Sequence, residues 1–451
     1  MSAGVRVGPT YSRHGRARRP DAVPGPRFQR AAGLRFFDAG WFAMLEASQR
    51  RYGDVFRLRL PVFGEAVVIG EPAAFRAVLL DNDATLTQVA RGRPARGLVA
   101  TQPMALRDGP SHIARRRMIS PHFHGRRLAE HEATVASVVE AHAARLRAGQ
   151  QLRIADVSLP LMMDVTARTL FGFEGATERA RFALLFRRLL SAWATALLVP
   201  RALARDGMPG PWRRFVRARA DLRALVLAQI ERLRHAQDPG SSVCSMLLAA
   251  TDADGASLSE RELEDELLTL AIAGTHTTSA ALMWLFDYAL HDEDARRRLE
   301  ADPGDQPFAD ALIEETLRIQ TVIDAGPRTL ARDMELAGVD VPAGTVIYPT
   351  VHLIHRRPDL YDAPAEFVPE RFLGGRPSAL AWVPFGGGAH RCIGASLAQL
   401  QLRVALRELM TRWRFTPLRS SVSRPRRSAL FWVPAGGVPV QIERNATGRR
   451  T

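Results

Sequence analysis

The chain of 451 residues contains no lysine, so all 62 of its basic residues are arginines. Chemistry that needs an amine, such as a Schiff base or the lysine of a phosphate-binding loop, is therefore excluded. Cysteine is nearly absent, because only Cys244 and Cys392 occur. Two thiols cannot build a disulfide framework, a cysteine-rich zinc site or an iron–sulfur cluster. We expect Cys244 to be a small buried apolar residue.

The sequence also lacks a recognisable signal peptide or membrane anchor. Arginines crowd residues 1–20 and no apolar segment follows them, so this stretch is predicted to be a disordered basic tail of a cytoplasmic protein. The formal net charge of +15 is attributed to the general use of arginine, and no nucleic acid partner is expected. Residues 21–451 are expected to form one domain, because no internal repeat or interdomain linker is visible.

Hydrophobic periodicity indicates a mainly α fold with a small β region. Residues 55–70 and 336–348 alternate apolar and polar side chains around turns, which predicts two hairpin-like β units. Apolar residues recur at helical spacing in five long segments. These segments are residues 127–149, 156–172, 178–204, 211–236 and 295–319.

The longest apolar stretch, residues 267–286, is interrupted by a polar belt from Thr275 to Ser279. It is long enough to span a bilayer, but the polar belt argues against that. Ser259 and Glu262 ahead of it match a helix capping box. We therefore predict one long buried helix over residues 259–291, whose central polar side chains need partners.

The clearest chemical signal is the sequence PFGGGAHRCIG at residues 384–394, which is followed directly by an amphipathic helix. Consecutive glycines allow the backbone to approach a flat ligand, and His390 and Arg391 place cationic groups beside it. The start of the helix favours the thiolate form of Cys392. The loop is therefore suited to presenting a metal-binding thiolate.

This loop resembles the haem-binding loop of the cytochrome P450 family, in which the cysteine thiolate is the axial ligand of the iron. Further motifs of that family occur in the same order along the chain. The resemblance covers about residues 24–440 and implies the family's helix-rich, single-domain haem fold. The matching residues are His112, Arg116, Gly274, Thr277, Glu315, Arg318, Arg328, Arg371, Phe385, Gly388, His390, Cys392 and Gly394.

The resemblance also implies what these residues do. Cys392 would ligate the iron of haem b in the loop that includes Phe385, Gly388 and Gly394. Gly274 would leave room for dioxygen, and Thr277 would position the water that delivers protons. The carboxylates of the haem would pair with His112, Arg116, Arg328 and His390. A charge network behind the haem would consist of Glu315, Arg318 and Arg371.

At one catalytic position the chain departs from its family. The residue before Thr277 is usually acidic and feeds protons to the oxygen side, but here it is His276. An imidazole can also relay protons, and its ordinary pKa makes its charge sensitive near neutral pH. His276 is therefore either a proton relay, which we favour, or a spectator or substrate contact.

The implied activity is that of a monooxygenase, which inserts one oxygen atom from O2 into a lipophilic small molecule. Only 59 residues follow Cys392. They leave no room for a fused reductase, so electrons would come from NAD(P)H through a separate acidic ferredoxin and its reductase. Basic residues expected near the face that receives this partner are Arg115, Arg117, Arg126, Arg391 and Arg403.

The predicted substrate cavity is apolar, which favours a terpenoid, a fatty acyl chain, a steroid or a polyketide over a polar molecule. Ring coupling, desaturation and peroxide-driven chemistry stay open within the family, as does a haem-thiolate sensor or carrier outside enzymes. The expected lining residues are Leu98, Val99, Met104, Trp193, Leu197, Ala273, Val322, Ile323, Leu430 and Phe431.

Overall fold

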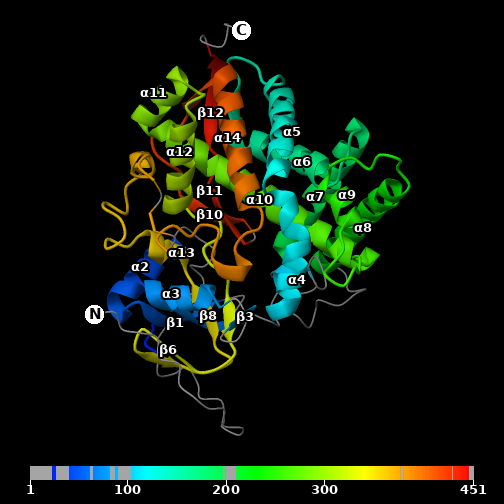
Figure 1. Cartoon of the computed structure of the whole chain (residues 1–451). Coiled ribbons are helices and arrows are strands. Elements are labelled where there is room, and N and C mark those ends of the chain that lie inside the picture. Colours follow the sequence, from blue (N-terminus) through cyan, green and yellow to red (C-terminus); the bar gives the residue numbers. More distant parts are fainter. Residues whose placement is uncertain are drawn as a thin grey trace.

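The computed structural model confirms a mainly helical chain with a small β region (Figure 1). It describes residues 23–26, 40–60, 64–81, 87–89, 103–196, 199, 210–375, 377–378, 380–428 and 430–445. The tail predicted at residues 1–20 lies outside this part of the chain. None of the described helices is long and apolar enough to cross a membrane.

The β region is built around a five-stranded sheet of order β1-β2-β8-β5-β3. The strands are β1 (Val55–Leu60), β2 (Gly64–Ile69), β3 (Thr87–Val89), β5 (Arg328–Leu330) and β8 (Val346–Pro349). Two helices, α2 (Gly40–Tyr52) and α3 (Pro72–Leu79), lie beside it in Figure 1. The antiparallel β1–β2 pair confirms the hairpin that was predicted over residues 55–70.

The second predicted hairpin, over residues 336–348, is wrong in its pairing. The turn falls at Ala337 and Gly338, both with positive φ, so β6 (Met334–Leu336) pairs with β7 (Val339–Val341). β8 leaves that unit and pairs in parallel with β2. Alternation of side chains shows that a segment is a strand, but it does not show which strand is its partner.

Helices supply most of the remaining structure. They are α4 (Gly109–Ile119), α5 (Arg126–Ala143), α6 (Ile154–Thr169), α7 (Ala176–Ala196), α8 (Pro211–Arg234), α9 (Val243–Ala249), α10 (Glu260–His291), α11 (Glu293–Ala301), α12 (Gln306–Ile319), α13 (Val351–His355) and α14 (Ala395–Arg412). Short 3-10 turns cover Met104–Leu106, Ser120–Phe123, Pro369–Phe372 and Gly388–His390. The other strands are β4 (Gln151–Arg153), β9 (Trp413–Pro417), β10 (Pro425–Ser428), β11 (Phe431–Pro434) and β12 (Pro439–Arg444).

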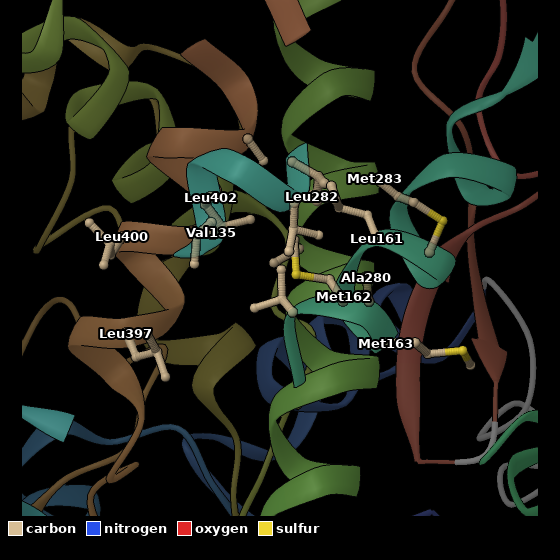
Figure 2. Close-up of a cluster of buried hydrophobic side chains, with 14 of the residues drawn as sticks. Val135, Leu161, Met162, Met163, Ala280, Leu282, Met283, Leu397, Leu400 and Leu402 are labelled. Atoms are coloured by element: carbon tan, nitrogen blue, oxygen red, sulfur yellow. The ribbon is translucent and has the colours of Figure 1, made fainter. Parts of the chain in front are cut away.

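Helix α10 is the central element of the fold. It begins with the predicted capping box, in which Ser259 and Glu262 each accept the other's backbone N–H. Its sides pack against α6 and α14, and apolar side chains of α5, α6, α10 and α14 meet around it (Figure 2). Two hydroxyls of the central belt have the expected partners, because Thr275 lies 2.7 Å from the Thr166 hydroxyl and Ser279 lies 3.0 Å from the Ser158 hydroxyl. The expectation fails at His276, whose Nδ1 has no hydrogen-bond partner among the described residues.

A buried ion pair fixes α12 against the chain that leads to Cys392. The guanidinium of Arg318 donates to both carboxylate oxygens of Glu315, at 2.6 and 2.7 Å, and both side chains are fully buried. Arg371 donates to the same carboxylate at 3.2 Å. Arg318 also donates to the carbonyl of His355, whose Nε2 accepts the Val383 N–H at 3.0 Å. The network thus reaches the segment immediately before the cysteine loop.

Glu315→Ala is expected to destabilise the protein by about 3–5 kcal/mol, because a buried pair that loses one partner leaves an uncompensated charge. Thermal unfolding of the haem-loaded protein measures the effect. Glu293→Ala, which removes one carboxylate of the exposed Glu293–Arg297 pair, is the matched control and should unfold like the wild type. Equal behaviour of the two variants would contradict the importance of the buried network.

Candidate active site

The loop before α14 leaves Cys392 exposed at the wall of a cavity. Positive φ angles at Gly386 (69°) and Gly388 (62°) turn the chain, and the Cys392 N–H donates to the Phe385 carbonyl at 2.9 Å. Desolvation in this cavity raises the pKa of the Cys392 thiol, while the Gly394 backbone and the nearby arginines act in the opposite direction. A thiolate here therefore needs further stabilisation, which a metal ion supplies.

Cys244 behaves as expected for a small buried residue. It is completely buried, and burial raises the pKa of its thiol to about 12. No thiolate forms at this position near neutral pH, and the residue is buried whereas Cys392 is exposed, which leaves Cys392 as the candidate metal ligand.

A cavity of about 520 Å³ lies between this loop and the middle of α10. A Cβ atom added to Gly274 would meet nothing within 4 Å, so the glycine leaves the cavity open at that point. Most of the wall is apolar, as predicted. The expected residues that line it are Trp193, Ala273, Gly274, Thr277, Val322, Ile323, Arg328, Phe385, His390, Cys392, Gly394, Leu430 and Phe431.

Basic side chains gather at one side of the cavity. The rings of His112 and His390 stack with centroids 3.9 Å apart, and Arg116 donates to the Arg391 carbonyl at 2.8 Å. Burial, reinforced by Arg328 and the other basic groups, lowers the pKa of His390 to about 3. Burial likewise lowers the pKa of Arg328, although the charges of Asp108 and Asp81 act in the opposite direction. The Asp108 carboxylate also lies 3.9 Å from His390 Nε2.

These groups fit the haem that the resemblance implies. A buried guanidinium at a cavity wall is stabilised by an anion, and Arg geometry matches a carboxylate. His112 is an exception, because its two ring nitrogens contact backbone carbonyls, Met104 O at 3.0 Å and Ala389 O at 2.9 Å, and it could bind a haem carboxylate only by giving up one of these contacts. The thiol at one wall and the basic cluster at the same end are the donor set that an iron porphyrin with two carboxylates requires.

Thr277 and His276 face different surroundings, although they are adjacent on α10. Thr277 lines the cavity and donates its hydroxyl to the Ala273 carbonyl one turn earlier. The His276 ring instead stacks on Phe431 with centroids 4.6 Å apart, and its Nδ1 has no hydrogen-bond partner among the described residues. Burial lowers the pKa of His276 to about 4, so its charge is not sensitive near neutral pH as the sequence suggested.

Two predicted placements are wrong. Arg115 does not lie on the exposed face expected to receive an electron donor, because its side chain is buried and pairs with Glu262 and Glu266 of α10. Met104 does not line the cavity, because its side chain packs in the core. Neighbouring residues form the wall there instead, namely Pro103, Ala105 and Leu106.

The predicted set of lining residues differs in two further ways from the cavity wall that the structure describes. Leu98, Val99 and Leu197 fall outside the described residues. Phe75 and Leu79 of α3, Phe123, and Leu170 of the segment after α6 line the cavity without having been singled out in the sequence. No local motif marks them, because they reach the cavity only through the packing of distant segments.

Comparison with known proteins supports the same assignment. The family model "Cytochrome P450" matches residues 22–438. The chain is 31% identical over 431 residues to cytochrome P450 135B1 of Mycobacterium tuberculosis, covering 93% of this chain and 91% of the relative. It is 32% identical over 432 residues to cytochrome P450 137 of the same organism, covering 94% and 91%.

Solved structures show the same fold. The retinoic acid-bound cyanobacterial CYP120A1 superposes with a TM-score of 0.80 at 23% identity, covering 94% of this chain and 99% of that chain. The cytochrome P450 hydroxylase LnmA from the leinamycin biosynthetic pathway of Streptomyces atroolivaceus gives 0.69 at 24% identity, covering 89% and 95%.

Cys392→Ser should bind haem weakly or not at all, because a hydroxyl is a poor replacement for the thiolate. The position of the Soret band of the reduced carbonyl complex measures this, since a thiolate ligand shifts it to longer wavelength. Cys244→Ala is the control and should keep both haem content and spectrum. A thiolate spectrum retained by Cys392→Ser would contradict the ligand assignment.

His276→Gln should remove a pH dependence of stability that lies below neutral pH. The folded protein holds His276 neutral down to a pKa of about 4, whereas the unfolded chain takes up a proton near its ordinary pKa of 6.5. The wild type therefore loses stability relative to the Gln variant as the pH falls from 7 to 5, by about 2 kcal/mol at most. Melting temperatures of both proteins across this range measure the difference, and parallel curves would contradict the buried neutral imidazole.

Proposed function

This chain belongs to the cytochrome P450 family and is a monooxygenase, and we propose that it hydroxylates or epoxidises a lipophilic small molecule with one oxygen atom from O2. The observation that carries the proposal is the apolar cavity that separates Cys392 from Gly274 and Thr277 of α10. When bound there, the haem supplies the activation of dioxygen, which thiolate ligation favours.

The residues of the chain prepare the site for this chemistry. The Cys392 thiolate would hold the iron, and His112, Arg116, Arg328 and His390 would bind the haem carboxylates, the arginines as cations and the histidines as hydrogen-bond donors. Gly274 keeps the wall of α10 clear of side-chain atoms. Thr277 presents a hydroxyl at the cavity, where it can hold the water that delivers protons.

The substrate is proposed to be a terpenoid, fatty acyl, steroid or polyketide compound, because the wall recognises size and shape. Trp193, Leu430 and Phe431 form part of this apolar wall. The retinoic acid bound to CYP120A1, a protein of the same fold, is itself a lipophilic molecule. A role in secondary metabolism is consistent with this substrate class.

Electrons are proposed to come from NAD(P)H through an acidic ferredoxin and its reductase in the cytoplasm. Of the five basic residues expected to attract the ferredoxin, Arg117, Arg126 and Arg391 are exposed, whereas Arg403 is half-buried and pairs with Asp310 at 2.8 Å. Charge complementarity at such a face raises the rate of encounter more than the affinity.

Turnover of a lipophile library with NADPH, ferredoxin and reductase tests the proposal against the open alternatives. A product that carries one oxygen atom from labelled O2 is expected, with peroxide alone giving much slower turnover. Oxidised products without added oxygen would indicate ring coupling or desaturation. Spectral binding without any turnover would indicate a sensor or carrier.

Thr277→Ala should uncouple the cycle, so that NADPH is consumed and peroxide is released in place of product. We expect the product formed per NADPH to fall by about two orders of magnitude, the lower end of the contribution of a positioned proton donor. Thr411→Ala removes a hydroxyl that donates in the same way to a carbonyl one turn earlier, on α14 and away from the residues that line the cavity. That control should keep the wild-type ratio, and equal losses in both variants would contradict the role of Thr277.

The same assay separates the two interpretations of His276. A relay role predicts uncoupling in His276→Gln, whereas a spectator or substrate contact predicts normal coupling with altered substrate affinity. The stacking of His276 on Phe431 provides a direct route for the second effect, because Phe431 lines the cavity.

A further inference from the structure

Glu266 is a buried carboxylate that the proposed mechanism does not use. It lies on α10 two turns before Gly274, and only 2% of it is exposed. Burial raises its pKa to about 7, and the nearby Arg115 only partly offsets this. Burying a carboxylate costs free energy unless the group is paired or hydrogen-bonded, so its partners indicate its role.

The group that Glu266 holds is a turn beside the substrate cavity. Glu266 Oε1 accepts the backbone N–H of Met104 at 2.8 Å, and Arg115 Nη1 lies 3.7 Å from the same oxygen. Met104 begins the 3-10 turn Met104–Leu106. Two residues of this turn, Ala105 and Leu106, line the cavity.

The same turn also contacts the basic cluster. The carbonyl of Met104 accepts a hydrogen bond from His112 Nδ1 at 3.0 Å. The N–H of Met104 is therefore bound by Glu266 of α10, and its carbonyl is bound by His112 of α4. Within the turn, the Leu106 N–H donates to the Pro103 carbonyl at 2.9 Å and the Arg107 N–H to the Met104 carbonyl at 3.1 Å. The bonds from Glu266 and His112 add the links that tie this turn to α10 and α4.

We propose that Glu266 is a positioning residue that sets substrate specificity by holding the turn Met104–Leu106 against α10. This inference rests on the proposed function of the cavity. The length of the Glu266 side chain matters because its oxygen must reach the Met104 N–H, whereas its charge is secondary because the amide of Gln offers an equivalent acceptor.

Two substitutions separate these features. Glu266→Asp keeps the charge but shortens the side chain by one methylene, and Glu266→Gln keeps the length but removes the charge. Glu264 supplies the matched control, because it is a buried carboxylate on the same helix that pairs with Arg223 of α8 at 2.8 Å. Glu264→Asp and Glu264→Gln make the same chemical changes away from the turn.

The probes are imidazole, 4-phenylimidazole and clotrimazole, titrated spectrally into the haem-loaded enzyme. Imidazole reports on the iron alone, whereas the larger azoles also contact the cavity wall. In Glu266→Asp we expect clotrimazole to bind about tenfold more weakly and imidazole to bind normally, as for loss of one hydrogen bond to a charged group. Glu266→Gln and both Glu264 variants should bind all three azoles like the wild type.

The proposal is overturned if Glu266→Asp binds clotrimazole normally, if it weakens all azoles equally, or if Glu266→Gln is affected as strongly. Azole binding needs the haem but no turnover, so failure of the proposed reaction would leave this result intact.

Hydrogen exchange of the wild-type enzyme gives a test that needs no variant. The Met104 amide should exchange at least about tenfold more slowly than the exposed Ala105 amide, and equal rates would contradict the bond to Glu266.

Discussion

The cavity between α10 and the cysteine loop is the constraint on which the rest of the structure depends. Protein interiors are close-packed, so an internal space of about 520 Å³ persists only if its walls are held from behind. The Glu315–Arg318 pair holds the segment before Cys392 in this way. Asp324 does the same for the cavity residues Ile323 and Ala325, because it accepts hydrogen bonds from Trp41 and Thr350.

The buried charged groups are arranged in a regular way around the cavity. Basic groups lie at the end of the cavity where the haem carboxylates would bind. Buried carboxylates lie behind the cavity walls, where arginines or backbone N–H groups bind them. The pKa values of Arg328 and His390 are lowered by burial and that of Glu266 is raised, so burial disfavours the charged form of each group and a partner of opposite charge offsets this cost. Cofactor binding and the stability of the fold are therefore linked.

Structural features that a short segment of the sequence encodes by itself were predicted correctly. The capping box at Ser259 marked the start of α10, and the glycine-rich loop identified Cys392 because helix start, turn and thiol are adjacent in the chain. Features that arise from distant packing were not predictable. Arg115 is buried only because α4 meets α10, which brings Glu262 to it from 147 residues away. The single helical segment predicted over residues 295–319 is in fact two helices, α11 and α12.

Anomalous diffraction at the iron edge from crystals of the haem-loaded enzyme tests the central claim most directly. The account predicts a single iron peak in the cavity, bonded to the sulfur of Cys392 and facing Gly274 and Thr277 of α10. An iron peak at any other place, or an iron atom in the cavity without a bond to Cys392, would contradict it.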